Sequence, residues 1–261
     1  MRLYLVFFLF LLGHQLMGQG FQGISTELKK QIKMANEKKD LIQLGQFFIG
    51  RPYSHMALSK ANPEIVYYSF QDFDCVTFIE NILALYLSKG IDSTFQRHLI
   101  DLRYFKSNDI RYETRMHYLS SALEKWQKLG IVSPIHYSKE QVLQKNIHYL
   151  SSYLHDKNLP IDLAQIQKTE QAISKKTISY IDPKNVGQFL SKLKSGDIIA
   201  FLSKRSDLDF KHVGFITIQR GKTYLLHASQ EKKVICTSDQ DLVSYLKNHP
   251  AMIGIQVYRL N

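Results

Sequence analysis

The sequence contains little cysteine and no internal repeat. Two of its 261 residues are cysteine, Cys75 and Cys236, so at most one disulfide can form. A disulfide-stapled fold is not expected, because such folds rely on several bridges around a small core. A single Cys75–Cys236 bridge stays open, although Cys236 lies in a strand-like run where cysteine behaves as a small apolar residue. A hydrophobic core must therefore stabilise the fold.

Long hydrophobic runs are absent except at the start of the chain. Residues 3–12 are all apolar, Arg2 precedes them, and residues 13–20 are mostly small or polar. Ten apolar residues are too few to span a bilayer, so this pattern predicts a secretory signal peptide over residues 1–19. An uncleaved N-terminal anchor is the alternative. We expect residues 20–261 to form one exported domain, periplasmic or extracellular, with no stable membrane span.

Negative charge is the scarcer sign. Lysine and arginine number 34 against 23 aspartates and glutamates, a net charge of +11. The lysines are scattered, no basic helix with interleaved aromatic residues is present, and a nucleic-acid partner is not predicted. An exported basic protein can meet an anionic polymer such as a cell wall with carboxylates. The alternative is that the excess lysine only keeps the protein soluble.

The order of the predicted elements favours an α+β fold. Helical spacing of apolar residues covers 23–48, 75–88 and 92–105, and the middle, 108–187, is irregular, with helical patches at 120–129 and 163–175. The last third changes to strand-like runs separated by short turns, which predicts a small antiparallel sheet. We expect helices packed on this sheet, with insertions between them. The predicted strands are 196–201, 213–218, 223–228, 234–237 and 253–260.

Cys75 is the first candidate for chemistry, because it begins the helix predicted for residues 75–88, with Asp72 or Asp74 as its cap. The positive end of a helix dipole and free backbone N–H groups favour a thiolate over a thiol. A thiolate is the form that attacks carbonyl carbons. Packing alone is the ordinary role of a buried cysteine at such a position.

Two histidines on consecutive predicted strands complete a candidate triad. His212 would exchange a proton with Cys75, and His227, fifteen residues later, would orient the far nitrogen of His212. We expect the two to face each other across adjacent antiparallel strands, with Cβ atoms about 4.5–5.5 Å apart. The N–H of Cys75 and the hydroxyl of Tyr53 are candidates for binding an oxyanion.

A zinc site is the main rival use of these residue types. Zinc sites use closely spaced pairs such as H-x₃₋₅-H or C-x₂-C. His212 and His227 do not have this spacing, and Cys75 has no partner cysteine nearby. We therefore predict no metal and no cofactor.

Several segments resemble a known family. They are residues 50–53 (GRPY), 74–80 (DCVTFIE), 196–199 (GDII), 212–215 (HVGF) and 227–229 (HAS). Together they resemble the NlpC-type, papain-like superfamily of cell-wall cysteine hydrolases. More narrowly, D-C-V-T-F-x-E in place of D-C-S-G, the element 115–118 (RMHY) and the run 208–212 resemble the N-acetylmuramoyl-L-alanine amidase-like family, formerly a domain of unknown function.

The resemblance implies an enzyme that acts on peptidoglycan or muropeptides. It implies cleavage of the amide between the lactyl group of N-acetylmuramic acid and L-alanine, through Cys75, His212, His227 and a thioester. Asp74, Arg115 and His117 are predicted to bind substrate, with a purely structural role for Arg115 and His117 as the alternative. Two other functions stay open. One is an endopeptidase cutting between D-glutamate and the diamino acid, and the other is a wall-binding protein without activity.

Overall fold

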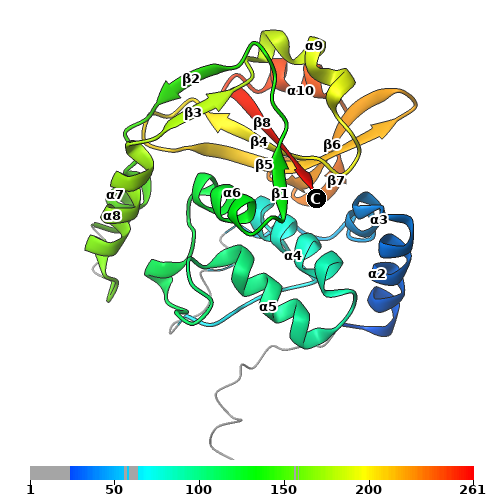
Figure 1. Cartoon of the computed structure of the whole chain (residues 1–261), viewed down its shortest axis with the longest axis horizontal. Helices are drawn as coiled ribbons and strands as arrows, with labels where there is room; N and C mark the ends of the chain where they lie inside the picture. The colour runs from blue at the N-terminus through cyan, green and yellow to red at the C-terminus, as the bar shows by residue number, and fades with distance from the viewer. Residues whose placement is uncertain (1–23, 56–57, 59–63, 156, 158) are drawn as a thin grey trace, which may run out of the picture.

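The computed structural model describes residues 24–55, 58, 64–155, 157 and 159–261. The predicted signal peptide, residues 1–19, lies outside these ranges. Within them, no helix has both the length and the apolar character that crossing a bilayer requires. Figure 1 shows a central sheet with one group of helices below it and short helices above it.

The first predicted helix, residues 23–48, is two helices. Helix α2 (Thr26–Lys38) ends where Lys39 adopts a left-handed conformation, with φ of 52°. Helix α3 (Leu41–Gln46) then starts afresh, because the Asp40 carboxylate accepts hydrogen bonds from the first free N–H groups of the new helix. The prediction of one helix is wrong here because apolar periodicity continues across a break made by polar residues.

Helix α4 (Cys75–Ser88) has its predicted bounds and forms the centre of the helical layer. Residues 77–85 are all buried, so every face of this helix contacts protein. Lys89 and Gly90 both have positive φ and end the helix, as predicted. Helix α5 (Asp92–Arg103) packs against α4 and ends two residues before the predicted boundary.

The last third of the chain builds the predicted antiparallel sheet. Six strands are paired in the order β1-β8-β4-β5-β6-β7, and every pair is antiparallel. The strands predicted from the sequence are all present. They are β4 (Ile198–Ser203), β5 (Phe210–Gln219), β6 (Lys222–Ser229), β7 (Val234–Thr237) and β8 (Met252–Leu260).

Apolar side chains cover both faces of this sheet. On one face Val213 and Phe215 of β5 face α4, and the ring of Phe78 lies 5.9 Å from that of Phe215. On the other face Ile199 and Phe201 join a second core with helix α10 (Leu242–Asn248). Helix α10 was not predicted, and it covers the face that carries the histidines.

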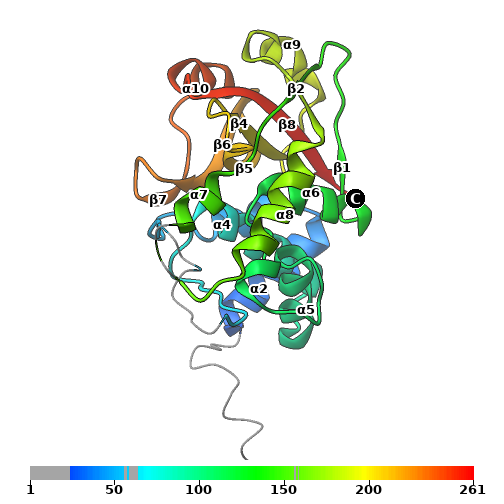
Figure 2. The same ribbon diagram turned by 90° about the vertical axis from the view of Figure 1, so that its left-hand side faces the viewer.

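The middle of the chain is more regular than expected. Helices α6 (Leu119–Lys128) and α8 (Leu163–Ser174) confirm the two predicted helical patches, but strand β1 (Val132–Pro134) pairs with β8 and extends the main sheet. Figure 2 shows α7 and α8 in front of the sheet. The remaining elements are η1 (Tyr112–Thr114), β2 (Gln141–Gln144), α7 (Tyr149–His155), β3 (Thr177–Tyr180), η2 (Pro183–Asn185), α9 (Val186–Phe189) and η3 (Leu190–Lys192).

The architecture confirms the α+β class. Helices α2 to α6 form one layer, the antiparallel sheet forms the next, and α9 and α10 cover its far side (Figure 1). This arrangement brings the N-terminal end of α4 against the beginning of β5, although more than a hundred residues separate them in the chain.

Candidate active site

Cys75 is fixed at the first position of α4 by a capping box. The Asp74 Oδ1 atom accepts hydrogen bonds from the N–H groups of Val76 at 2.9 Å and Thr77 at 2.7 Å, and the Asp74 N–H donates to Thr77 Oγ1 at 2.9 Å. Of the two caps that the sequence offered, Asp72 and Asp74, the structure uses Asp74. This local pattern sets where the helix begins and holds the thiol on its first turn.

The Cys75 sulfur lies against strand β5. The residue is partly exposed and forms no disulfide with Cys236. The backbone N–H groups of Val213, the residue after His212, and of Cys75 and Val76 lie near enough to the sulfur to lower the pKa of the thiol. These donors favour the thiolate, and they place the sulfur beside the strand that carries the first candidate histidine.

Burial nevertheless raises the pKa of the Cys75 thiol to about 12, and the neighbouring Asp74 carboxylate adds to the rise. The expectation of a thiolate favoured by the helix N-terminus is therefore wrong for the site without substrate. The reason is that Asp74 occupies helix N–H groups and brings a negative charge next to the sulfur, while the low-dielectric surroundings penalise ionisation. The resting nucleophile is a thiol.

His212 and His227 form a direct hydrogen-bonded pair, with 2.7 Å between His212 Nε2 and His227 Nδ1. Their rings lie nearly perpendicular, at 81°, with centroids 5.0 Å apart. In the tautomer in which His212 Nε2–H donates, His212 Nδ1 is left as a free base. Among the described residues no hydrogen bond joins either imidazole to the Cys75 sulfur. The first turn of α4, which carries Cys75, and strand β5, which carries His212, approach each other at Val213.

The two histidines do not face each other directly, contrary to expectation. Strands β5 and β6 pair Phe215 with Leu226, and continuing this register places His227 opposite Gly214. A Cβ atom on Gly214 would lie 3.1 Å from the His227 Cβ and 2.5 Å from the Leu225 Cδ1. Glycine therefore lets the His227 ring extend across β5 to reach His212, two residues along the strand.

Comparison with known proteins identifies the family of this chain. The model of the AmiA-like, N-acetylmuramoyl-L-alanine amidase-like family matches residues 43–255, which include Cys75, His212 and His227. The chain belongs to this family. No match is found among the curated proteins.

Solved structures resemble this amidase-like protein over most of its length. An N-acetylmuramoyl-L-alanine amidase from Bacteroides uniformis is 27% identical, with a TM-score of 0.77 over 85% of this chain and 99% of that chain. A second structure of that description, from the same organism, is 25% identical, with a TM-score of 0.75 over 90% and 99% of the two chains. A Bacteroides fragilis protein with a provisional xylanase name is 28% identical, with a TM-score of 0.74 over 83% and 99%.

Both imidazoles of the amidase-like site are held neutral. Burial lowers the pKa of His212 well below its usual value of 6.5, and electrostatic interactions with His227 and His249 lower it further. Burial also lowers the pKa of His227 to about 4. A neutral His212 can accept a proton, so the resting site pairs a thiol with an unprotonated base.

Tyr53 lies close enough to Cys75 and Asp74 for their charges to act on its hydroxyl, and its binding of an oxyanion stays a prediction. Its N–H donates to the carbonyl of Lys233 at 2.8 Å, so the segment that carries it runs along β7. Burial raises the pKa of the Tyr53 hydroxyl, and the charges of Cys75 and Asp74 add to the rise. The hydroxyl therefore keeps its proton and can donate a hydrogen bond near the sulfur.

Three residues at the site were not assigned to it from the sequence. The ring of Tyr245 on α10 lies 5.7 Å from that of His227 and stacks on His249 at 4.0 Å. Cys236 Sγ lies 3.9 Å from His227 Nε2. A cavity of about 230 Å³ opens beside His227, Tyr245 and His249. No sequence signal located these contacts, because α10 was not predicted and its position depends on the sheet.

Arg115 and His117 already have protein partners. Arg115 Nη1 lies 3.2 Å from Glu64 Oε1, and the guanidinium packs on the ring of Tyr112 at 4.7 Å. His117 Nε2 lies 2.8 Å from the Tyr112 carbonyl oxygen, and burial lowers the pKa of His117 to about 3. These contacts give both residues structural roles. Their binding of substrate stays a prediction.

A buried lysine fixes the loop that leads into β5. Lys145 Nζ donates to the carbonyls of Arg205 at 2.6 Å and Leu208 at 2.9 Å, and also to that of Ser203. The buried Asp209 accepts from the N–H of Ser120 at 2.8 Å through Oδ2. These bonds hold the chain three residues before His212 and so orient the start of β5.

Proposed function

We propose that this protein is an exported N-acetylmuramoyl-L-alanine amidase that acts on peptidoglycan fragments through Cys75, His212 and His227. The observation that carries the proposal is the 2.7 Å hydrogen bond between His212 on β5 and His227 on β6, with the Val213 N–H of β5 near the Cys75 sulfur. Membership of the amidase-like family supports the choice of an amide bond. The proposal includes a papain-like site of the NlpC type and removal of residues 1–19 on export.

The proposed reaction begins with a proton transfer. The Cys75 S–H proton moves to His212 Nδ1 as the sulfur forms a bond to the lactyl carbonyl carbon. The proton must move during attack, because burial keeps Cys75 a thiol and His212 neutral. The His212 Nε2–H bond to His227 Nδ1 stabilises the resulting imidazolium.

Collapse of the tetrahedral intermediate completes acylation. The N–H of Cys75 and the Tyr53 hydroxyl donate hydrogen bonds to the oxyanion. His212 gives its proton to the nitrogen of L-alanine, the C–N bond breaks, and the stem peptide leaves. Water, deprotonated by His212, then cleaves the thioester and restores the thiol.

A sugar-cleaving activity, as in the xylanase name of one structural neighbour, fits these residues less well. Retaining and inverting glycosidases use two carboxylates on either side of the scissile bond. The carboxylate next to the Cys75 sulfur is Asp74, and its Oδ1 already binds two backbone N–H groups. Acyl-transfer enzymes use a thiol as the nucleophile and a neutral imidazole as the base.

Product analysis tests the proposal. The purified protein is incubated with defined muropeptides, and the products are weighed by mass spectrometry. Free sugar plus the intact stem peptide is the expected result, and Cys75→Ala should produce neither. A shortened stem would assign the chain as an endopeptidase between D-glutamate and the diamino acid. Unchanged hydrolysis by Cys75→Ala would remove the thiol from the mechanism.

A further inference from the structure

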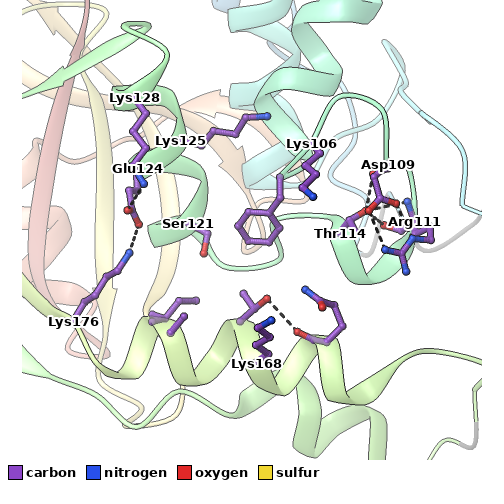
Figure 3. A pocket seen from close by; sticks show the side chains of 15 residues that line it. Lys106, Asp109, Arg111, Thr114, Ser121, Glu124, Lys125, Lys128, Lys168 and Lys176 are labelled. Atoms are coloured by element: carbon purple, nitrogen blue, oxygen red, sulfur yellow. Dashed lines mark hydrogen bonds and ion pairs between the residues drawn. The ribbon is translucent and has the colours of Figure 1, made fainter.

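A wide basic groove lies away from Cys75, between α6, α8 and the loop that follows α5. Its volume is about 580 Å³, within the range of ligand sites. Figure 3 shows side chains from the loop, from α6 and from α8 turned toward this space. Six cations and two carboxylates line it: Lys106, Arg111, Lys125, Lys128, Lys168 and Lys176, with Asp109 and Glu124. The groove therefore carries a large excess of positive charge.

Both carboxylates of the groove already form ion pairs with cations of the groove. Glu124 bridges Lys128 at 2.7 Å and Lys176 at 2.5 Å, and Asp109 binds Arg111 through both of its oxygens (Figure 3). These pairs fix the ends of the groove and leave other cations without a carboxylate partner.

The uncompensated charge comes from three lysines. In the described part of the chain, Lys106, Lys125 and Lys168 form no salt bridge. Lys125 donates to the Tyr104 carbonyl at 2.5 Å and is held in place, whereas Lys106 and Lys168 are exposed on opposite walls. An anion between these walls would meet cations from both sides.

Uncharged groups in the groove suit a peptide with acidic groups. The Ser121 hydroxyl and the Gln165 amide line it, next to the apolar side chains of Phe105 and Ile173, whereas the hydroxyls of Thr114 and Thr169 bind backbone carbonyls. A second cavity of about 200 Å³ shares Ser121 and Lys176 with the groove and extends it to Phe210, at the start of β5. The surface therefore continues towards the catalytic strand.

We propose that this groove is a second binding site, for the carboxylate-bearing stem peptides of peptidoglycan, and that it holds the enzyme on the polymer while Cys75 acts elsewhere on it. This inference rests on the proposed function for the identity of the polymer. The site binds and takes no part in bond cleavage.

The test compares two double variants of the full chain, each in a Cys75→Ala background. Lys106→Glu with Lys168→Glu reverses both walls of the groove, and Lys30→Glu with Lys38→Glu makes the same change of net charge on α2. Binding to purified sacculi is measured by co-sedimentation at low salt. We expect the groove variant to bind roughly tenfold more weakly and the α2 variant to bind as the parent does.

Chemical amidation of the sacculi separates this site from general charge attraction. Amidated sacculi should bind the parent as weakly as native sacculi bind the groove variant. Equal losses in both double variants, or full binding to amidated sacculi, would overturn the proposal. With Cys75 restored, the groove variant should cleave soluble muropeptides at the parental rate. An absence of cleavage by the parent would overturn the proposed function and leave the binding comparison intact.

Discussion

The candidate active site and the basic groove differ in the environment of their ionisable side chains, which is buried in the first and exposed in the second. At the candidate active site, burial raises the pKa of the Cys75 thiol and lowers that of the His212 ring, so that both are uncharged near neutral pH. In the groove, Lys106 and Lys168 are exposed and carry their charge into solvent. The first arrangement suits proton transfer during a reaction, and the second suits attraction of a charged polymer. Activity at the first should therefore depend on pH, and binding at the second on salt.

Removing the nucleophile should have the largest effect. Cys75→Ala is expected to lower kcat/KM on soluble muropeptides by at least about 10³-fold, because the covalent route is lost. Cys236→Ala should cost less than about tenfold, because Cys236 only contacts the far nitrogen of His227. Steady-state kinetics on both variants provides the measurement. A similar loss in the two would contradict the assigned roles.

The next largest effect on activity should come from adding one methyl group at Gly214. Gly214→Ala places a Cβ atom 3.1 Å from the His227 Cβ, so β6 must move and lengthen the His212–His227 hydrogen bond. We expect roughly a 10²-fold loss of kcat and about 1–3 kcal/mol lower stability. Gly187→Ala is the control, because nothing lies within 4 Å of a Cβ atom at that position. A fully active Gly214→Ala enzyme would show that the pair tolerates a shifted strand.

The pH dependence of kcat/KM distinguishes a neutral pair of Cys75 thiol and His212 imidazole from a thiolate–imidazolium ion pair. With the pKa of His212 lowered and that of Cys75 raised to about 12, the reactive form is thiol plus imidazole. Plots of kcat/KM should therefore rise on an acid limb below pH 6.5 and stay level to about pH 9. A bell with a fall near pH 8 would instead indicate a thiolate–imidazolium pair. Salt should leave this profile unchanged while it weakens binding to sacculi.

The smallest expected effect concerns stability in acid. The pKa of His117 is about 3 in the fold, against 6.5 ordinarily, so the unfolded chain takes up the proton first as pH falls. The stabilisation is complete above pH 6.5 and declines as the pH falls to about 3. His117→Gln should reduce this decline by about 2 kcal/mol in urea unfolding. His136→Gln, at an exposed position, should follow the parent, and the same decline in both variants would exclude His117 as its source.

Local signals in the sequence predicted the catalytic helix well. Asp74 as the cap and Lys89 with Gly90 as the stop gave the bounds of α4, because each acts through hydrogen bonds within one turn of the helix. The strands of the last third were also predicted, since each apolar run is separated from the next by short polar turns. The break at Lys39 and Asp40 was missed, because apolar spacing does not report the capping bond that starts α3.

The sequence by itself determined which residues are candidates for chemistry, namely Cys75, His212, His227 and Tyr53, because motif and order are properties of the chain. Tertiary structure decided the rest: the two-residue offset across Gly214, the contact of Tyr245 with His227, and the rise of the Cys75 pKa. It also brought together lysines from α6, α8 and the loop after α5 in one groove. Desolvation and the field of neighbouring charges act through space, so they depend on which segments the fold places side by side.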